Sequence, residues 1–138
     1  MVDLSVIVPC YNEENNLMDL VTIVLGSFNK NKINGEMVLV NDGSMDRTGI
    51  EVERLKGQFK GIMGVNHTEN LGITEAWYSG LKSSRGEYVV TIDADLQYNP
   101  EDILVLYKEI KKSKYDLVQG WRKEYRDNNL LRKILSRA

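Results

Sequence analysis

The chain has 138 residues, of which 42% are hydrophobic and 28% are charged, and its formal net charge is only −2. A chain of this length can bury one sizeable core, so we expect a single domain over 1–138. Lysine and arginine are spread along the sequence with no excess of positive charge, which argues against a nucleic-acid-binding protein.

The cysteine content and the lengths of the apolar runs indicate the cellular compartment in which the protein is expected. Cys10 is the single cysteine and His67 the single histidine, which excludes an internal disulfide and a Cys/His zinc framework and favours a reducing, cytoplasmic setting. The first residues lack the basic and apolar regions of a signal peptide, and no apolar run reaches the about 20 residues of a membrane span. We expect a soluble cytoplasmic protein and leave peripheral contact with the cytoplasmic face of a membrane open.

Short runs rich in valine and isoleucine alternate with longer stretches of helical periodicity. The runs are LSVIV (4–8), EMVLV (36–40), GIMGV (61–65), EYVVTI (87–92) and YDLVQG (115–120). Continuous hydrophobicity in short runs indicates strands that are covered on both faces. The alternation predicts an α/β fold with a mostly parallel sheet and helices on both faces.

Two of the longer stretches carry a clear apolar stripe. The first consists of Leu17, Leu20, Val21, Val24 and Phe28, and the second, which follows Pro100, consists of Ile103, Leu104, Leu106, Tyr107 and Ile110. Both stripes predict amphipathic helices. The tail, 120–138, is basic and predicts a further amphipathic helix, which could lie on an anionic membrane surface or pack on the rest of the protein.

Acidic residues follow three of the predicted strands at the point where each strand ends. PCYNEE brings Glu13, NDGSMD brings Asp42, and DADLQ brings Asp93 and Asp95. Because ligands of parallel α/β sheets bind at the carboxyl ends of the strands, we expect these carboxylates to converge. Carboxylates that lie close together raise one another's pKa or recruit a cation, and a hard divalent ion is the simplest solution.

Structural alternatives apply to several of these positions. Aspartate also caps helices and forms turns, which is an alternative for Asp42 and the favoured interpretation of Asp46. His67 lies in a polar loop, NHTEN, and is expected at the surface. Cys10 is expected to be a small buried packing residue. Trp77 and Tyr78 fit the core face of a helix better than a stacking platform.

Three familiar nucleotide and hydrolase motifs are absent from the sequence. It contains no G-x-x-x-x-G-K-[ST] phosphate loop, no G-x-G-x-x-G fingerprint and no G-x-S-x-G elbow. The P-loop, classical dinucleotide and α/β-hydrolase interpretations therefore lose their main support. In the missing glycine-rich motifs, backbone amides bind the phosphates of a nucleotide. If a nucleotide binds to this protein, a metal that bridges its phosphates to carboxylates must take over that role.

Four blocks of the sequence resemble one known family. SVIVPCYNEE, VLVNDGSMDRT, NLGITEAWYSGLKSSRGEYVVTIDADLQYNPEDI and DLVQGWR are similar to successive blocks of the GT-A inverting glycosyltransferases of family 2. The most similar branch is that of dolichol-phosphate mannosyltransferase and the polyprenyl-phosphate glycosyltransferases. A D-x-D pair alone is weak evidence, but DADLQ followed by Pro100 and Glu101, in order behind the other blocks, is highly specific.

The resemblance implies an activity and a set of partners. The protein would be a glycosyltransferase that uses a UDP- or GDP-sugar with Mg²⁺ or Mn²⁺ and transfers the sugar to a polyprenyl or dolichyl phosphate. Charge builds on the leaving diphosphate as the glycosidic bond breaks, so cationic groups there would stabilise the transition state. An ionised lipid phosphate would need no protein base. The oligomeric state stays open, a dimer included.

The resemblance also implies roles for individual residues. Nucleotide-sugar contacts would come from Pro9, Tyr11, Asn12, Glu13, Val40, Asp42, Asp93, Ala94 and Arg126. The metal ligands would be Asp93, Asp95 and Gln97, and the catalytic residues would be Asp95 and Arg122. Arg122 and Arg126 are similar to the basic residues that meet the acceptor phosphate or the leaving diphosphate.

Two departures from the family pattern lead to alternatives. The block NLGITEA lacks the lysine that often follows this glycine, and the chain ends where acceptor-binding elements would begin. The sequence therefore predicts a fold that is incomplete at its C-terminus, with a non-catalytic nucleotide-sugar-binding module as the first alternative. A haloacid-dehalogenase-type phosphatase is a weaker alternative, because Gln97 stands where such enzymes place Thr or Ser.

Overall fold

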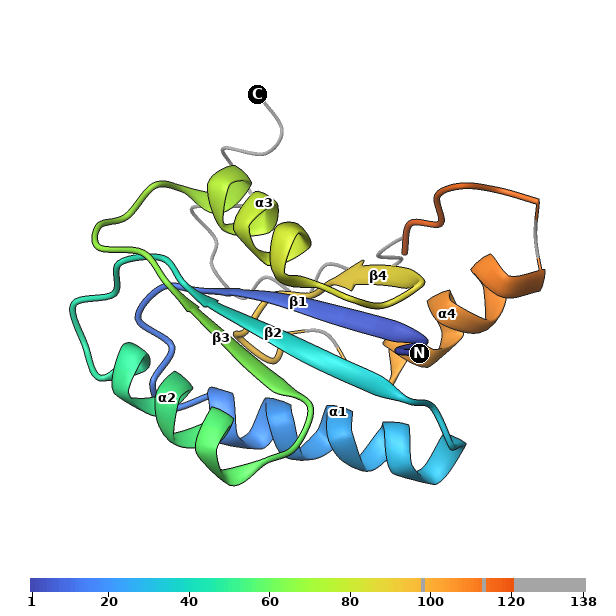
Figure 1. Cartoon of the computed structure of the whole chain (residues 1–138), viewed down its shortest axis with the longest axis horizontal. Coiled ribbons are helices and arrows are strands. Elements are labelled where there is room, and N and C mark those ends of the chain that lie inside the picture. Colours follow the sequence, from blue (N-terminus) through green and yellow to red (C-terminus); the bar gives the residue numbers. More distant parts are fainter. Residues whose placement is uncertain (98, 113, 121–138) are drawn as a thin grey trace, which may run out of the picture.

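The computed structural model describes residues 1–97, 99–112 and 114–120. The elements follow in the order β1 (Leu4–Cys10), α1 (Leu17–Asn31), β2 (Gly35–Asn41), α2 (Thr48–Gln58), β3 (Ile62–Asn66), α3 (Ile73–Ser83), β4 (Tyr88–Thr91) and α4 (Asp102–Lys112). The strands form one sheet in the order β3-β2-β1-β4, in which all neighbours are parallel (Figure 1). This confirms the predicted α/β fold.

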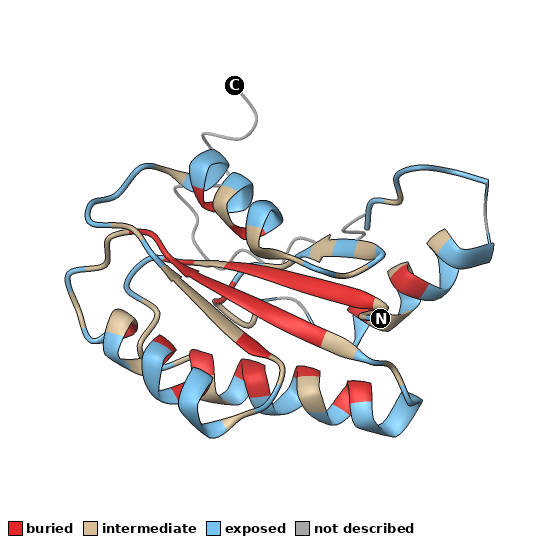
Figure 2. Ribbon diagram, viewed as in Figure 1, coloured by how far each residue is buried: buried red, intermediate tan, exposed pale blue. Residues whose placement is uncertain are grey.

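Helices cover both faces of the sheet, as Figure 1 shows. On one face, alternate β1 residues such as Val6 and Val8 are fully buried in a core cluster that includes residues of α1, α2 and α4. On the other face, Ile7 and Val40 pack with Ala76 of α3. The two central strands, β1 and β2, are therefore buried over nearly their whole length (Figure 2), which explains their continuous apolar runs.

The two predicted apolar stripes both face the core. In α1, all five stripe residues are buried, and the helix is followed by its C-cap residue Lys32, which adopts a left-handed conformation with φ 55° and ψ 40°. In α4, Ile103 and Tyr107 are buried and Ile110 is partly buried against the same cluster. The helical periodicity of the sequence therefore predicted which face of each helix packs on the sheet.

The predicted strand at 115–120 is wrong, because this segment is irregular in the structure. Tyr115 and Leu117 are 72% and 81% exposed, so the apolar residues of the segment do not join the core. Hydrophobic, β-branched composition favours a strand only where a neighbouring strand supplies hydrogen bonds and packing. Among the described residues, β4 is the edge strand on this side and no further strand pairs with it.

The prediction that Trp77 and Tyr78 face the core is also wrong. They are 41% and 53% exposed, whereas Ala76 and Gly80 are the buried residues of α3. A Cβ atom at Gly80 would lie 2.3 Å from Cγ2 of Ile7 and 3.2 Å from Cγ2 of Val40. Because bulky strand residues fill this space, α3 can approach the sheet only with its small residues, and the aromatic rings lie on the outer side.

A matched pair of glycine substitutions tests this close packing. Gly80→Ala is expected to lower the free energy of unfolding by about 1–3 kcal/mol, because the new methyl group overpacks the contact with Ile7. Gly26→Ala lies inside α1 with nothing within 4 Å of the new carbon, and it should raise the free energy of unfolding by about 0.5–1 kcal/mol. Urea unfolding measures both, and equal effects would contradict the close approach of α3.

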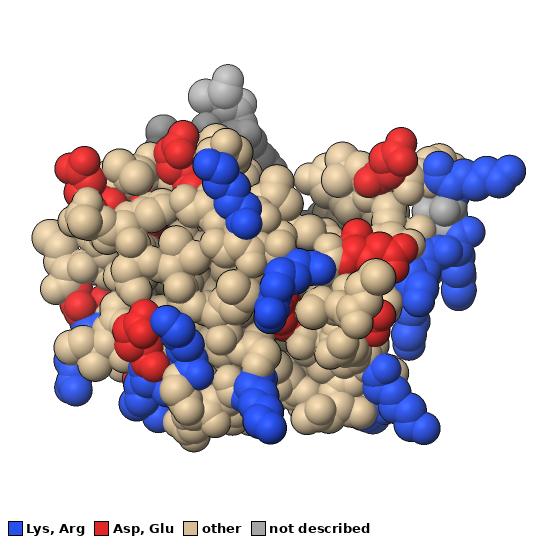
Figure 3. Space-filling view, viewed as in Figure 1, with Lys and Arg blue, Asp and Glu red and all other residues tan. Residues whose placement is uncertain are grey.

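Charged side chains of both signs intermingle over much of the face seen in Figure 3. Lys111 and Lys112 lie in the last turn of α4, and α4 lies at the edge of the molecule where the strands begin (Figure 1).

None of the helices formed by the described residues has the length and hydropathy needed to cross a bilayer.

Candidate functional site

A pocket of about 290 Å³ opens at the carboxyl ends of the strands. It is lined by Pro9, Cys10, Tyr11, Glu13, Asp42, Asn70, Gly72, Ile73, Ala76, Asp93, Ala94 and Asp95. These residues come from the ends of β1, β2 and β4 and the loops that follow them, and from the β3–α3 connection and the start of α3. The strand-end carboxylates, which the sequence predicted to converge, all line this one pocket.

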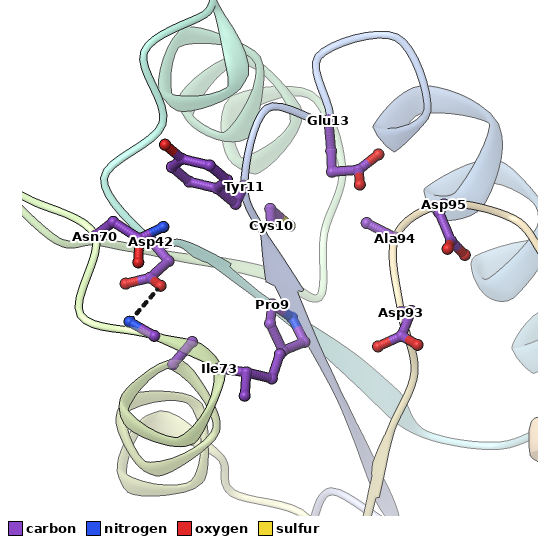
Figure 4. Close-up of a pocket in the computed structure, with 12 residues that line it drawn as sticks. Pro9, Cys10, Tyr11, Glu13, Asp42, Asn70, Ile73, Asp93, Ala94 and Asp95 are labelled. Carbon is purple, nitrogen blue, oxygen red and sulfur yellow. Dashed lines mark hydrogen bonds between the residues drawn. The ribbon is translucent and has the colours of Figure 1, made fainter. Parts of the chain in front are cut away.

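The acidic side chains lie on different sides of the pocket. Figure 4 shows Asp42 and Asn70 on one side of the end of β1, and Asp93, Asp95 and Glu13 on the other. Negative charge is therefore concentrated on the side that Asp93 and Asp95 form. A ligand that lies across the pocket would meet this pair at one end and Asp42 at the other.

The D-x-D segment follows β4 and brings both of its aspartates to the pocket. Ala94 is buried, while Asp93 is exposed and Asp95 is half-buried. The Oδ1 atom of Asp95 accepts a hydrogen bond of 3.0 Å from the amide of Gln97. Leu96 between them has a φ of 56°, a conformation that is uncommon for a residue other than glycine and is often found at functional sites.

The β1–α1 loop is locked to the β2–α2 loop by reciprocal hydrogen bonds. The amide of Asn12 donates to Ser44 Oγ at 3.0 Å, and the Oδ1 atom of Asn12 accepts from the amide of Met45 at 3.0 Å. The amide of Glu13 donates to Thr48 Oγ1 at 2.8 Å. These bonds fix Glu13 beside the pocket, whereas the side chain of Asn12 is held by the neighbouring loop and is not among the lining residues.

Asp46 belongs to the same loop contact and is structural, as expected. Its Oδ1 atom accepts a hydrogen bond of 2.9 Å from the amide of Thr48, the first residue of α2. Its Oδ2 atom accepts from the amide of Glu14 at 3.4 Å. Asp46 therefore satisfies a free amide at the start of α2 and ties the two loops together.

Asp42 is held firmly beside the pocket by three hydrogen-bond donors. Its Oδ1 atom accepts from His67 Nδ1 at 2.7 Å and from the amide of Leu71 at 2.9 Å. Its Oδ2 atom accepts from the amide of Gly72 at 2.9 Å, the bond drawn as a dashed line in Figure 4. Burial acts to raise the pKa of Asp42, but these hydrogen bonds outweigh it and hold the pKa below its usual value. Asp42 is therefore ionised at neutral pH.

The prediction that His67 lies at the surface is wrong, because its side chain is only 9% exposed. The loop after β3 folds back over the end of β2, and the backbone amide of His67 donates to the carbonyl of Asn41 at 2.9 Å. The polar letters of NHTEN indicated a solvated loop, but the imidazole is enclosed between Asp42 and α3.

Cys10 is fully buried, as predicted. Burial is the main cause that raises the pKa of its thiol far above the ordinary value, so Cys10 has no nucleophilic role at neutral pH. Val40 is also fully buried, in the core beneath α3 and outside the pocket lining. Gln97 is exposed and is not among the lining residues, and the predicted Arg122 and Arg126 lie outside the described residues.

The sequence did not single out the residues that the β3–α3 connection brings to the pocket. Asn70, Gly72, Ile73 and Ala76 line it from this side. A usable signal was present, since β3 is a parallel strand beside β2 and its carboxyl end opens at the same edge. Ligands of parallel α/β sheets bind at the carboxyl ends of the strands, and this rule, applied to β3 as well, would have indicated the β3–α3 connection.

Two carboxylates of the pocket could serve as ligands of a divalent cation. Within the described ranges, no group of three or more His, Cys, Asp or Glu residues is placed to hold a metal ion. Asp93 and Asp95 supply a pair of hard oxygen ligands at the pocket. Mg²⁺ in particular is usually bound by one or two carboxylates together with substrate phosphates and water.

The sequence matches the glycosyl transferase family 2 over residues 5–138. The chain belongs to this family. Family 2 membership agrees with the resemblance carried by the strand-end blocks, and it leaves the phosphatase alternative without support.

Two curated relatives of the family 2 chain are transferases that are named for a polyprenyl phosphate. Dodecaprenyl-phosphate galacturonate synthase of Rhizobium johnstonii is 36% identical over 135 residues, which are 97% of this chain and 40% of that protein. Undecaprenyl-phosphate 4-deoxy-4-formamido-L-arabinose transferase of Pectobacterium atrosepticum is 36% identical over 137 residues, 99% of this chain and 41% of that protein. The chain thus spans about two fifths of the length of these relatives.

Solved structures of glycosyltransferases share the fold. The mannosyltransferase PcManGT of Pyrobaculum calidifontis, in complex with GDP-Man and Mn²⁺, superposes with a TM-score of 0.64 at 29% identity over 73% of this chain and 30% of that one. TarS of S. aureus, in complex with UDP-GlcNAc, gives a TM-score of 0.63 at 29% identity over 80% of this chain and 32% of that one. The predicted GT-A fold is confirmed.

Proposed function

We propose that this family 2 domain binds a nucleotide-diphosphate sugar with a divalent cation and takes part in inverting transfer of the sugar to a lipid phosphate. One observation carries the proposal: Asp93 and Asp95 line the opposite side of a single pocket from Asp42, at the carboxyl edge of the sheet. The mannosyltransferase structure with GDP-Man and Mn²⁺ and the TarS structure with UDP-GlcNAc support a donor of this class.

We assign one end of the donor to each side of the pocket. A diphosphate is repelled by a pair of carboxylates unless a cation lies between them. Asp93 and Asp95 would therefore hold Mg²⁺ or Mn²⁺, which when bound would neutralise charge on the leaving diphosphate. Gln97 is proposed as a further ligand. The nucleoside end would then lie toward Asp42, Tyr11 and Pro9.

The acceptor is proposed from the names of the relatives, which refer to dodecaprenyl and undecaprenyl phosphate. A phosphate monoester has a second pKa of about 6, so it is largely ionised at neutral pH and needs no protein base to become nucleophilic. We assign Arg122 and Arg126 to the acceptor phosphate or the leaving diphosphate. Such an acceptor would place the protein at the cytoplasmic face of a membrane.

A non-catalytic nucleotide-sugar-binding module is the second candidate function. It is favoured by one observation, that the carboxylates proposed to contact the donor all line one pocket formed by the described residues. A module with this pocket would bind the nucleotide sugar whether or not it also transfers the sugar.

Calorimetric titration of the chain with UDP and with GDP, each with and without Mn²⁺, tests the donor site. We expect one of the two nucleotides to bind at least about tenfold more tightly with the metal, since the cation removes repulsion at Asp93 and Asp95. Absence of metal-dependent binding for both nucleotides would overturn the proposal. A sugar-transfer assay on undecaprenyl phosphate, with this chain and with any longer product of the same gene, separates the enzyme from the binding module.

A further inference from the structure

His67 forms a continuous hydrogen-bonded chain with Asp42 on one side and Ser79 on the other. Its Nδ1 atom lies 2.7 Å from Asp42 Oδ1, and its Nε2 atom lies 2.8 Å from Ser79 Oγ. The side chains of His67 and Asp42 are 9% and 6% exposed. The imidazole therefore joins the end of β2 to the middle of α3 inside the protein.

The chemistry of the two partners fixes the tautomer of the ring. An ionised carboxylate only accepts hydrogen bonds, so Nδ1 of His67 carries a proton and donates it to Asp42. In the neutral ring, Nε2 then accepts from the hydroxyl of Ser79. If the ring becomes charged, Nε2 donates to the same hydroxyl oxygen, because a hydroxyl serves both as donor and as acceptor. The bond to Asp42 is kept in either state.

The orientation of Asp42 is fully determined by its donors. A carboxylate has about four lone-pair sites, and the donors from His67, Leu71 and Gly72 occupy three of them, two on Oδ1 and one on Oδ2. One site on Oδ2 is left for a ligand. Because Asp42 lines the pocket, this free site is available to an N–H or O–H donor of a bound ligand.

The same three residue types form the hydrolytic Ser-His-Asp triad, but this chain cannot act in that way. Ser79 lies within α3 (Ile73–Ser83), where the backbone amides are used by the helix and cannot form an oxyanion hole. Ser79 is also absent from the residues that line the pocket. The chain of hydrogen bonds therefore leads toward Asp42 and orients it.

We propose that His67 is the positioning residue that holds Asp42 in the orientation needed to recognise the nucleoside end of the donor. The inference rests on the proposed function of the pocket and adds a recognition device to it. Asp93 and Asp95 lie on the other side of the pocket (Figure 4), so His67 acts on the nucleoside and not on the metal–diphosphate end.

Two amide substitutions of His67 distinguish the hydrogen bond of Nδ1 to Asp42 from the hydrogen bond of Nε2 to Ser79. Asn places its amide nitrogen where Nδ1 of His67 lies, and Gln places its amide nitrogen where Nε2 lies. His67→Asn should keep the donor to Asp42 and retain nucleotide affinity within about twofold, whereas His67→Gln should lose that donor and weaken binding about tenfold. Ser79→Ala removes only the bond to α3 and is expected to stay within about twofold of the wild type.

The measurement is calorimetric titration of each variant with Mn²⁺ and UDP or GDP, repeated with Mn²⁺ and inorganic pyrophosphate. Pyrophosphate probes the Asp93 and Asp95 side alone, and its affinity should be the same in all variants. Equal losses in His67→Asn and His67→Gln, or a loss of pyrophosphate binding together with nucleotide binding, would show that His67 only supports the fold and would overturn the proposal.

A second measurement needs no nucleotide and keeps the inference distinct from the proposed function. A ¹³C NMR titration of the Asp42 carboxyl group reports its pKa, which the donor from His67 lowers. We expect this pKa to rise in His67→Gln and to stay low in His67→Asn. The same pKa in both variants would refute the positioning role, even if the wild type binds nucleotide as proposed.

Discussion

The double variant Asp93→Asn, Asp95→Asn is expected to lose at least about a hundredfold of its nucleotide affinity in the presence of Mn²⁺, because replacing even a residue that only supports a metal ligand costs about 10–100-fold. Asparagine keeps the size of the side chain and removes its charge. Both positions line the pocket, Asp93 exposed and Asp95 half-buried, so neither side chain belongs to the core. The variant should therefore fold like the wild type.

Without metal, the same double substitution should not weaken nucleotide binding. The two carboxylates then repel the diphosphate, so their removal should leave nucleotide affinity unchanged or raise it. The measurement is calorimetry with and without Mn²⁺. Asp19→Asn, an exposed substitution in α1 outside the pocket lining, is the control. If the double variant weakens binding equally in both conditions, Asp93 and Asp95 do not act through a cation.

The location of the pocket could be predicted from the sequence because it depends on few assumptions. Short apolar runs indicated parallel strands, and the carboxyl ends of parallel neighbours meet at one edge. Glu13, Asp42 and Asp93 follow β1, β2 and β4, which are neighbours in the sheet. The carboxylates therefore converge once the strands pair, whatever the details of the loops.

The contacts made by side chains of α3 could not be predicted in this way. Hydrophobic periodicity places the largest apolar residues toward the core, but Ile7 and Val40 leave room only for Ala76 and Gly80. That outcome depends on the distance between the helix and the sheet, which no single segment encodes. The burial of His67 has the same origin, since its partners lie 25 and 12 residues away in the sequence.

The segment 115–120 shows a second reason why the sequence alone did not predict the structure correctly. Its residues have the composition of a strand, and this composition led to the incorrect prediction of a strand. A strand also needs a partner that satisfies its backbone groups. In the portion of the chain that the structure describes, β4 ends the sheet, so the propensity of 115–120 is not realised.

At the other end of the sheet, Glu36→Gln is expected to lower the free energy of unfolding by about 2–3 kcal/mol at neutral pH. Glu36 lies in β2 and is only 1% exposed. Its Oε1 atom accepts from Ser5 Oγ at 2.7 Å and from the amide of Arg85 at 2.6 Å, and its Oε2 atom accepts from Arg85 Nε and Nη2 at 2.9 and 2.7 Å. The carboxylate thus joins β1, β2 and the connection to β4.

Glutamine cannot replace this carboxylate, because it has only one acceptor oxygen. Its amide group would present N–H donors to the N–H donors of Arg85 or to the O–H donor of Ser5, and buried donors would be left without acceptors. Glu53→Gln is the matched control, since Glu53 is exposed and pairs with Lys56 on the surface of α2. That substitution should change the free energy of unfolding by no more than about 0.5 kcal/mol.

The difference between the wild type and Glu36→Gln should also depend on pH. Burial acts to raise the pKa of Glu36, but hydrogen bonds from Ser5 and Arg85 outweigh it and hold the pKa below its usual value. A carboxyl group with a lowered pKa in the folded state stabilises the protein fully above its unfolded pKa of about 4.3 and loses that contribution as the pH falls through the folded pKa. Urea unfolding at several pH values should therefore show a constant difference between about pH 7 and 5.5, and a smaller one in acid. A difference that persists unchanged in acid would mean that the shape of Glu36, and not its charge, stabilises this end of the sheet.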